Sequence, residues 1–376
     1  MTMRQESRSQ DSVRKFGVEE ELLLVEAGSL HPLPAAEQLV KLARRRSRSG
    51  HTITQEFKQE QIEVVSPPQT TLAAQLTAIR TGRAMAEEAA AQVGGRVVAL
   101  PTAPGALIPH LVPTPRFRQI RDSFGITAVE QLTCGFHVHV EINSREEGIA
   151  VMDRIRVWLP AILALSANSP FWGGVDTGFA SYRYQLWNRW PTAGPTEIFG
   201  SVDSYDRLCE ALLDTQVPMD IGMLYFDARL AERFPTIEVR VADVCPEAEH
   251  AAAIAALIRA LVETAACAWH DGVEPDPIRG ELLKTWSWQA SRDGVNSTLI
   301  LPSTGRRAPA AEVIASLLNH VRPALLKYGE EEAVTKTVEA ILRSDSGARR
   351  QREAYARRQN MYDVVSAAHE VTHHNG

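Results

Sequence analysis

The stretch FGVEEELLL, residues 16–24, decides the fold prediction for this chain of 376 residues. Side chains on a β-strand alternate between its two faces, so Glu19 and Glu21 would share one face, about 6.8 Å apart, and Val18 and Leu22 would share the other. Two ionised carboxylates at that distance repel each other by about 2–3 kcal/mol at an effective dielectric constant of about 20. We therefore expect a counter-charge beside this pair, and a hard cation is the leading candidate.

Two later segments have the same design. In TCGFHVHVEI, residues 133–142, His137 and His139 lie on one face of a predicted strand and apolar side chains lie on the other. In TIEVRVADV, Glu238 and Arg240 alternate with apolar residues in the same way. The pattern predicts a sheet with one face covered by helices and one open, polar face.

The open face would collect a set of acidic, imidazole and guanidinium groups. Carboxylate-rich oxygen ligands favour Mg²⁺ or Mn²⁺ over Zn²⁺. Metal ions that neutralise phosphate oxygens would allow ATP to bind although the chain has no GxxxxGK[ST] loop. The predicted set is Glu19, Glu21, Glu63, His137, His139, Glu141, Glu238 and Arg240.

The same residues also have structural interpretations. His137 and His139 could be hydrogen-bonded, partly buried histidines, and Glu238 with Arg240 could form a cross-strand ion pair. Glu20 falls on the apolar face, where a structural ion pair at a sheet edge is expected. The periodicity leaves both interpretations open.

Composition excludes several classes of protein. Hydrophobic residues at 44%, charged residues at 23% and a net charge of −6 are ordinary for a globular protein and argue against a general binder of nucleic acid or anionic membranes. The four cysteines are widely spaced, with no CxxC pair, which suits a reducing compartment. The N-terminal residues lack the apolar core of a signal peptide, and the apolar run near residues 157–165 is too short to span a bilayer. We expect a cytoplasmic protein.

The chain reads as one catalytic domain. Residues 1–14 are expected to be a flexible tail, and 15–376 a single domain with a helical C-terminal extension that is compatible with a homodimer. The basic cluster at 44–46 reads as a solvated helix face. Strands are predicted at 51–66 and 96–101, helices at 33–46, 70–93, 147–167 with a kink at residue 160, 208–213 and 247–269, and irregular structure at 168–195 and 284–301.

Five motifs in this order resemble one family. With FGVEEELLL come EFKQEQIEVVSPP at 56–68, CGFHVHVEI at 134–142, ALSANSPFW at 164–172 and IEVRVADVCP at 237–246. Over roughly residues 15–330 the chain resembles the glutamate–cysteine ligase type 2 family of carboxylate–amine ligases. The resemblance implies an α+β fold similar to glutamine synthetase: an antiparallel sheet curved into a half-barrel, helices on its outer face, and ATP with Mg²⁺ on its concave face.

The resemblance also implies roles for individual residues. Arg240 matches an arginine near the transferred phosphoryl group, and Glu56 matches an acidic position near the amine substrate. Because Glu56 and Glu63 differ in parity, a bulge or an irregular strand start is needed for both to face the site. The metal ligands implied by the same matching are Glu19, Glu21, Glu63, His137 and Glu238.

Further substrate contacts are expected from loop arginines. Arg183 and Arg189, in SYRYQLWNRWP, could bind the substrate carboxylate or the phosphates of ATP, and could equally brace the loop. His139 and Arg292 are additional candidates for binding substrate or ATP. The neighbouring Trp187 and Trp190 are expected to serve packing.

The implied reaction has two steps. The γ-carboxylate of L-glutamate attacks the γ-phosphate of ATP, and the amine of L-cysteine then displaces phosphate from the acyl phosphate. Another amine substrate is an alternative, as are a metal-dependent hydrolase that uses His137, His139 and the glutamates around Zn²⁺ or Mn²⁺, and a catalytically silent protein that binds nucleotide.

Overall fold

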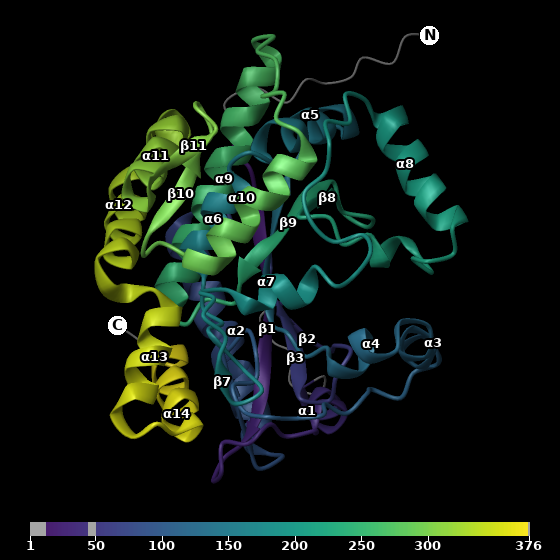
Figure 1. Cartoon of the computed structure of the whole chain (residues 1–376), viewed down its shortest axis with the longest axis vertical. Helices are drawn as coiled ribbons and strands as arrows, with labels where there is room; N and C mark the ends of the chain where they lie inside the picture. The colour runs from purple at the N-terminus through teal and green to yellow at the C-terminus, as the bar shows by residue number, and fades with distance from the viewer. Residues whose placement is uncertain (1–12, 44–49, 375–376) are drawn as a thin grey trace.

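A computed structural model describes residues 13–43 and 50–374 of the chain. Within these residues the centre of the fold is a seven-stranded sheet with the order β2-β3-β1-β5-β9-β8, in which β4 also pairs with β1 (Figure 1). Neighbouring strands in this sheet run antiparallel. Its strands are β1 (Phe16–Glu26), β2 (Thr52–Gln55), β3 (Gln61–Val65), β4 (Gly95–Val98), β5 (Gly135–Glu141), β8 (Ala228–Leu230) and β9 (Thr236–Asp243).

Two short hairpins lie outside this sheet, β6 (Phe171–Trp172) with β7 (Val175–Asp176) and β10 (Thr298–Leu301) with β11 (Arg306–Pro309). The helices are α1 (Ala36–Ala43), α2 (Leu72–Ala91), α3 (Pro115–Phe124), α4 (Ile126–Glu130), α5 (Arg145–Ile155), α6 (Leu159–Ser166), α7 (Tyr182–Trp187), α8 (Val202–Asp214), α9 (Ala248–His270), α10 (Gly280–Asp293), α11 (Ala310–Lys327), α12 (Glu331–Ala340), α13 (Gly347–Arg358) and α14 (Met361–Thr372), with short helical turns η1 (Ile221–Met223) and η2 (Ile341–Asp345).

Strand β1 changes character along its length. Its first half alternates, and Phe16 and Val18 point into the core while Glu19 and Glu21 face a cavity. Its second half, LLLV, is apolar at every position and is buried on both faces. The alternating half therefore carries the polar groups, and the continuous apolar half anchors the strand.

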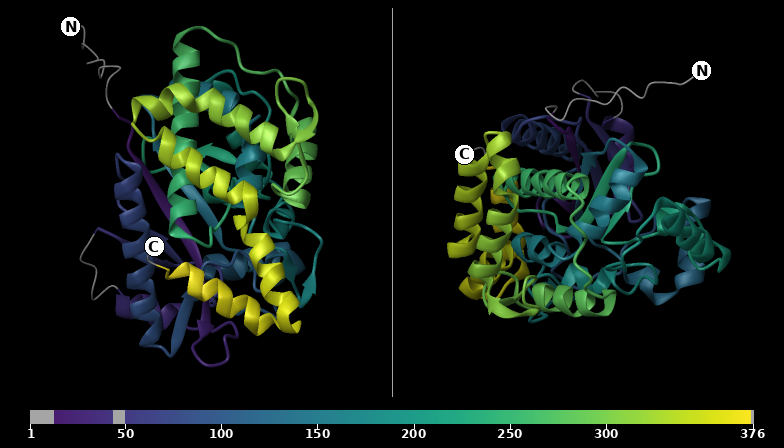
Figure 2. Two further views of the ribbon diagram at one scale, coloured as in Figure 1. Left: turned by 90° about the vertical axis from the view of Figure 1, so that its left-hand side faces the viewer. Right: turned by 90° about the horizontal axis from the view of Figure 1, so that it is seen from above.

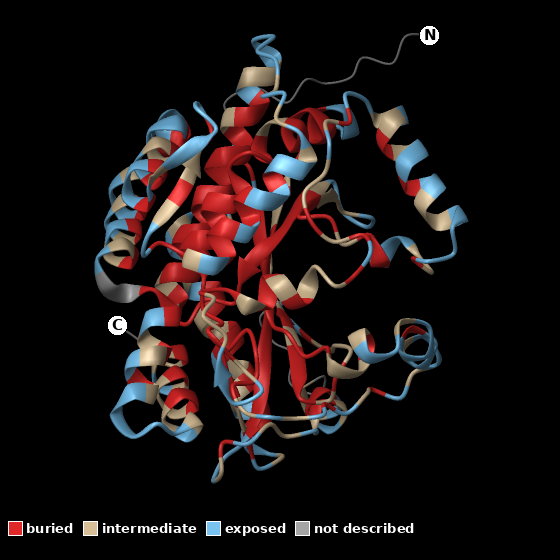
Figure 3. Ribbon diagram, viewed as in Figure 1, coloured by how far each residue is buried: buried red, intermediate tan, exposed pale blue. Residues whose placement is uncertain are grey.

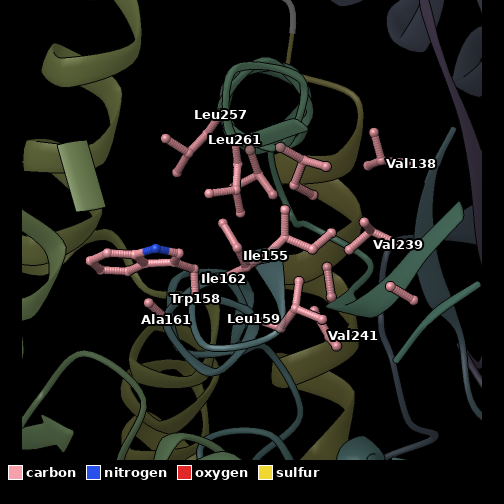
Figure 4. Packing of buried hydrophobic residues seen from close by; sticks show 14 of the residues in the cluster. Val138, Ile155, Trp158, Leu159, Ala161, Ile162, Val239, Val241, Leu257 and Leu261 are labelled. Carbon is pink, nitrogen blue, oxygen red and sulfur yellow. The ribbon is translucent and has the colours of Figure 1, made fainter. Parts of the chain in front are cut away.

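Helices cover the apolar face of the sheet. Val138 of β5 and Val239 of β9 pack against side chains of α5, α6 and α9, and the group includes Ile155, Leu159 and Leu257 (Figure 4). The buried residues follow this central layer (Figure 3). The predicted α+β fold class, with an antiparallel sheet and helices on one face, is confirmed, and the sheet is not closed into a barrel.

Helix α9 is apolar and long enough, by length and composition alone, to cross a membrane. In the fold, 83% of its most apolar window is buried inside the protein. Its composition is therefore explained by its position under the sheet, where it packs against α2, α5 and α11.

Helix α2 lies close to the β2–β3 hairpin. A Cβ atom at Gly82 would stand 2.8 Å from Val64 Cγ1 and 3.2 Å from His51 Cδ2. Glycine permits this close approach, by which the buried face of α2, which includes Arg83, packs on the back of the sheet.

The C-terminal helices α11–α14 form an outer layer over the other helices (Figure 2). The C-terminal part of the described chain is thus helical, and the division into one domain with an extension stays a prediction. The predicted tail falls mostly on residues 1–12, outside the described residues, as does the basic cluster at 44–46. Arg14 departs from that expectation, because its guanidinium lies 2.6 Å from both Glu147 and Glu263 and is mostly buried.

Several predicted elements differ in the structure. The strand predicted at 51–66 is a hairpin, because residues 56–60 form a turn without Gly, Pro or Asn to announce it. The kink predicted at Pro160 separates two helices, α5 and α6, and Pro160 lies in the first turn of α6. The prediction of irregular structure at 284–301 is mostly wrong, because this range holds most of α10 and all of β10. The side chains of Leu283, Trp286 and Ala290 give α10 a buried apolar stripe.

Candidate active site

A cavity of about 390 Å³ lies on the open face of the sheet. Strands β1, β3, β5 and β9 form its floor, and residues from α3, α7 and the segment around β8 form its walls. Its charged and imidazole lining consists of Glu19, Glu21, Glu56, Glu63, Glu232, Glu238, His137, His139, Arg116, Arg229, Arg233 and Arg240.

The strand register brings the predicted ligands together. Across β1 and β5, Glu19 is paired with His137, and across β1 and β3, Glu21 is paired with Glu63. Across β5 and β9, His139 is paired with Glu238. Residues that are separated by up to 118 positions in the sequence thus become direct cross-strand neighbours.

Two overlapping groups have ligand atoms within 4.8 Å of one another. One group is Glu19, His137 and Glu238, and the other is Glu21, Glu63 and His137. The structure therefore places all five predicted metal ligands in one cavity, and their role as ligands remains a prediction. Carboxylate oxygens outnumber imidazole nitrogens in both groups, which fits a hard divalent cation such as Mg²⁺ or Mn²⁺.

Glu19 lies between the two histidines. Its Oε2 atom is 3.3 Å from His137 Nδ1, and its Oε1 atom is 3.2 Å from His139 Nε2. Burial raises the pKa of the Glu19 carboxyl, but the hydrogen bonds and charges of the two imidazoles outweigh burial and lower it. Burial and the charge of Arg240 lower the pKa of His137, whereas Glu19 overcomes the effect of burial at His139 and raises its pKa.

Glu238 is held by two arginines. Arg229 Nε lies 2.7 Å from Glu238 Oε2, and Arg240 Nη1 donates to Glu238 Oε1. Burial opposes ionisation of Glu238, but the positive charges of Arg240 and Arg229 lower its pKa well below the usual range. Glu238 is therefore an anion at neutral pH and keeps a fixed orientation.

Glu56 and Glu63 behave in the opposite way. Burial, followed by repulsion from neighbouring glutamates that include Glu21 and Glu19, raises the pKa of Glu56 to about 8 and the pKa of Glu63 well above its usual value. The lining holds six carboxylates against four arginines and two histidines, and these cationic groups do not compensate the burial and mutual repulsion of Glu56 and Glu63. An added divalent cation would offset this repulsion, so the donor set fits a bound metal ion.

A register shift shapes the end of the cavity. Between the pairs Phe136–Ala242 and Val138–Val239, strand β9 has one residue more than β5, so Arg240 and Val241 lie opposite His137. This irregularity matches a β-bulge, which redirects side chains. Arg240 Nη1 lies 3.5 Å from His137 Nδ1, and its guanidinium stands 5.9 Å from the centre of the Trp187 ring.

The sequence and the fold both match known proteins. A family model described as "Glutamate-cysteine ligase family 2" matches residues 15–371. The chain belongs to this family. It is accordingly an enzyme of the carboxylate–amine ligase type, as the resemblance implied.

Close relatives in the family span the whole chain. A protein of Paenarthrobacter aurescens named "Putative glutamate--cysteine ligase 2-1" is 50% identical over 373 residues, which cover 97% of this chain and 96% of that protein. A Streptomyces coelicolor protein named "Putative glutamate--cysteine ligase 2" is 42% identical over 355 residues, covering 94% and 98%.

Solved structures share the fold at low sequence identity. A bifunctional glutathione synthetase from Pasteurella multocida superposes with a TM-score of 0.71 at 16% identity, over 96% of this chain and 52% of that chain. A glutamate–cysteine ligase from Francisella tularensis, solved in complex with AMP, gives 0.66 at 12% identity, over 96% and 89%. The predicted glutamine synthetase-like ligase fold is thereby confirmed.

Glu56 reaches the cavity of this ligase through an irregularity in the strand, as its position an odd number of residues from Glu63 required. Strand β2 ends at Gln55, and Glu56 begins the turn that leads to β3. The break in the strand turns Glu56 toward the same cavity as Glu63. His139 also lines the cavity, beside Glu19, as predicted from its face of the strand.

Three arginines that were expected to bind substrate or ATP, Arg183, Arg189 and Arg292, do not line the cavity. Arg183 is buried behind it, where its guanidinium lies 3.7 Å from Asp243 and within hydrogen-bond distance of the Arg240 and Val241 carbonyls. Arg189 pairs with Glu130 at 2.8 Å. Arg292 is exposed and donates to the Gly178 carbonyl. These positions do not fit the expectation that the three arginines contact substrate. Each guanidinium is directed away from the cavity and is already bound to a partner within the protein.

Arg183 instead supports the floor of the cavity. It occupies the space that a Cβ atom at Gly135 would fill, and that glycine precedes the HVHVE strand segment. The backbone N–H of Gly135 donates to Glu21. Arg183 therefore braces the strands that carry the predicted ligands, a structural role that differs from the loop bracing given as the alternative.

Sequence reasoning missed Arg229 and the aromatic wall. Arg229 lies in β8, which has three residues and no readable alternation. Trp187, Trp190 and Tyr225 line the cavity and pack on one another, with Trp187 and Tyr225 ring centroids 4.8 Å apart. The two tryptophans do serve packing, as expected, and they also line the site. Arg229 could have been found only with knowledge that β8 pairs with β9, which places Arg229 opposite Glu238.

Proposed function

We propose that this ligase joins the γ-carboxylate of L-glutamate to the amine of L-cysteine at the expense of ATP. The observation that carries the proposal is the convergence of Glu19, Glu21, Glu63, His137 and Glu238 with two arginines in one cavity. The ligase family and the names of the relatives support the choice of substrates. We further propose a cytoplasmic enzyme that acts on small molecules.

Mg²⁺, or Mn²⁺, would be held by these four glutamates and His137. When bound, it would neutralise phosphate charge on ATP that otherwise repels the incoming carboxylate. The AMP bound by the Francisella ligase of the same fold supports a nucleotide in this chain as well.

Arg240 is proposed to act on the transferred phosphoryl group. Glutamate attacks through a γ-carboxylate oxygen, a bond forms to the γ-phosphorus, and ADP leaves. Negative charge then spreads over the phosphoryl oxygens, and the guanidinium of Arg240 stabilises it from a buried position fixed by Glu238. Arg229 is a positioning residue for the same carboxylate.

Glu56 is proposed to accept the proton of the amine once a bound cation has offset the burial and the neighbouring carboxylates that raise its pKa to about 8. The amine nitrogen attacks the carbonyl carbon of the acyl phosphate, phosphate leaves with the bonding electrons, and the nitrogen loses a proton to a carboxylate. Glu56 lines the same cavity as the proposed metal ligands of β5 and β9. The wall formed by Trp187, Trp190 and Phe117 limits the water that could hydrolyse the intermediate.

The test is ADP release, measured with ATP, Mg²⁺ and L-glutamate in the presence and absence of L-cysteine and across a panel of other amines. Release that needs both glutamate and cysteine supports the proposal. Release that needs a different amine keeps the ligase mechanism and changes the substrate. If no amine or acid stimulates release, a hydrolase or a silent nucleotide-binding protein replaces it.

A further inference from the structure

A second cluster of metal-binding side chains lies on the helix-covered side of the sheet. It consists of Glu87 from α2 with His369 and His373 from the C-terminal end of α14. Glu87 is one helical turn beyond Arg83, which binds Glu20 on the face of β1 opposite to the active-site cavity. The mechanism proposed above uses none of these residues.

Two of the distances within this cluster are close to the edge of a tetrahedral site. Glu87 Oε1 lies 3.1 Å from His369 Nε2, and Glu87 Oε2 lies 3.4 Å from His373 Nε2. Bonds of about 2.0–2.1 Å from Zn²⁺ to nitrogen and oxygen give a tetrahedral edge of about 3.3 Å. The two histidines are four residues apart, so they lie on the same face of the helix end.

The donor set differs from that of the active site. Two imidazoles and one carboxylate favour Zn²⁺ or a related first-row transition metal, whereas the glutamate-rich active site favours Mg²⁺. The cluster borders a separate cavity of about 460 Å³, so that an ion can reach it and keep one coordination position for water. Each of the three side chains is partly exposed, at 18–24%, and none needs to be uncovered first.

A cationic group already occupies this position. Arg96 Nη1 lies 3.4 Å from both Glu87 Oε1 and His369 Nε2, so the cluster already faces a positive charge. The Arg96 side chain is 44% exposed and can swing into solvent when an ion replaces it. Metal binding through His373 Nε2 also requires that nitrogen to leave its 2.9 Å contact with the Val97 carbonyl.

We propose that Glu87, His369 and His373 bind a transition-metal ion of the Zn²⁺ class, which clamps α14 to α2. The clamp would act where α14 already contacts the sheet, since Thr372 Oγ1 accepts from the Ala99 amide and the Thr372 carbonyl accepts from Arg83. A metal ion that joins groups 282 or more residues apart in sequence stabilises the folded chain and not the unfolded one.

The test uses the full chain freed of metal by a chelator and dialysed. Zn²⁺ titrated by calorimetry, and Co²⁺ followed by visible absorption, should show one equivalent with the intense bands of a tetrahedral ion. To remove competition from the active site, the same titration is run on the Glu19→Gln/Glu21→Gln variant, which should retain that equivalent. Zn²⁺ at about a hundredfold excess over its Kd should raise Tm by about 3 °C.

The cluster variants decide the assignment. Glu87→Gln, His369→Gln and His373→Gln should each weaken Zn²⁺ binding by at least about tenfold and abolish the rise in Tm, whereas His374→Gln should leave both unchanged. His374 is adjacent in sequence and lines the same cavity but is not part of the group. Far-UV circular dichroism checks that each variant is folded. If the histidine variants detach α14, the Glu87→Gln variant still tests the site, because it keeps both imidazoles.

The proposal is overturned if the equivalent survives in the His369→Gln/His373→Gln variant or disappears with Glu19→Gln/Glu21→Gln. It is also overturned if only His374→Gln weakens binding, or if Zn²⁺ leaves Tm of the wild-type chain unchanged.

Discussion

Glu20 and Glu21 are adjacent on β1, and we expect their glutamine variants to fail in opposite ways. Glu21 faces the active-site cavity, and Glu20 faces α2. The Glu20→Gln variant should lose stability and keep most of its turnover. The Glu21→Gln variant should lose turnover and keep its stability.

The expected loss of stability follows from the ion pair between Glu20 and Arg83. Arg83 donates to Glu20 through two nitrogens, at 2.7 and 3.1 Å, and each side chain is 2% exposed. Removal of one partner of such a pair costs about 3–5 kcal/mol. Arg83 keeps bonds to the Cys245, Pro246 and Thr372 carbonyls, so we expect about 3 kcal/mol.

This free energy converts to a shift of Tm. An unfolding entropy of about 2.1 cal/mol/K per residue over 376 residues is about 0.8 kcal/mol/K, so about 3 kcal/mol lowers Tm by about 4 °C. In Glu21→Gln the amide oxygen can still accept from Gly135, and repulsion from Glu63 in the facing strand is removed. Its Tm should stay within about 1 °C of the wild-type value or rise above it.

Loss of a ligand carboxylate should reduce turnover of Glu21→Gln by about 100-fold or more. Thermal unfolding is followed by circular dichroism without ligands, and turnover by ADP release with ATP, Mg²⁺, glutamate and cysteine at 25 °C. If Glu21→Gln turns over normally with unchanged Mg²⁺ dependence, the site assignment fails. If Glu20→Gln leaves Tm unchanged, the estimate for the buried ion pair fails.

Three further variants test other contacts. Glu238→Gln should abolish ADP release while circular dichroism still reports a folded chain. Arg229→Lys, which cannot contact Glu238 with a planar fork, should lower kcat/KM by about tenfold and require more Mg²⁺, and an unchanged Mg²⁺ requirement would contradict a positioning role. Arg14→Met should lower Tm at pH 7. Burial alone would raise the pKa of both Glu147 and Glu263. Hydrogen bonds from Arg14 outweigh burial at Glu147, and hydrogen bonds from a lysine and Arg14 outweigh it at Glu263, so the pKa of each carboxyl is lowered. The stability they contribute is therefore present above their unfolded pKa of about 4.3 and is lost as pH falls through the lower folded value, so the difference in Tm between wild type and Arg14→Met should shrink below about pH 4. A difference that grows in acid would contradict this linkage.

Alternation along the strands was enough to predict most of the site. His137 and His139 on one face of β5, and Glu238 and Arg240 on one face of β9, all reach the cavity because an apolar opposite face fixes which side each strand turns inward. Glu20 was also predicted as an ion-pair partner from its face alone. Its place at a sheet edge was wrong, because β1 lies between β3 and β5.

Local pattern failed where the partner of a side chain lies in a distant segment. Arg183, Arg189 and Arg292 share composition with phosphate-binding arginines, but their direction depends on Asp243, Glu130 and the Gly178 carbonyl. No period in the sequence encodes those partners. The grouping of Glu87 with His369 and His373 was equally unreadable, because the two histidines follow Glu87 by more than 280 residues.

The sequence by itself determined the faces: which side chains of each strand point to water and which to the core, since that follows from a period of two and from burial of apolar surface. Only the tertiary structure decided the neighbours. The order of strands and their register place Glu19 beside His137 and Glu21 beside Glu63, and the contact of α14 with α2 brings the second histidine cluster to Glu87. These pairings depend on packing between distant segments, which alternation within a single strand or helix does not specify.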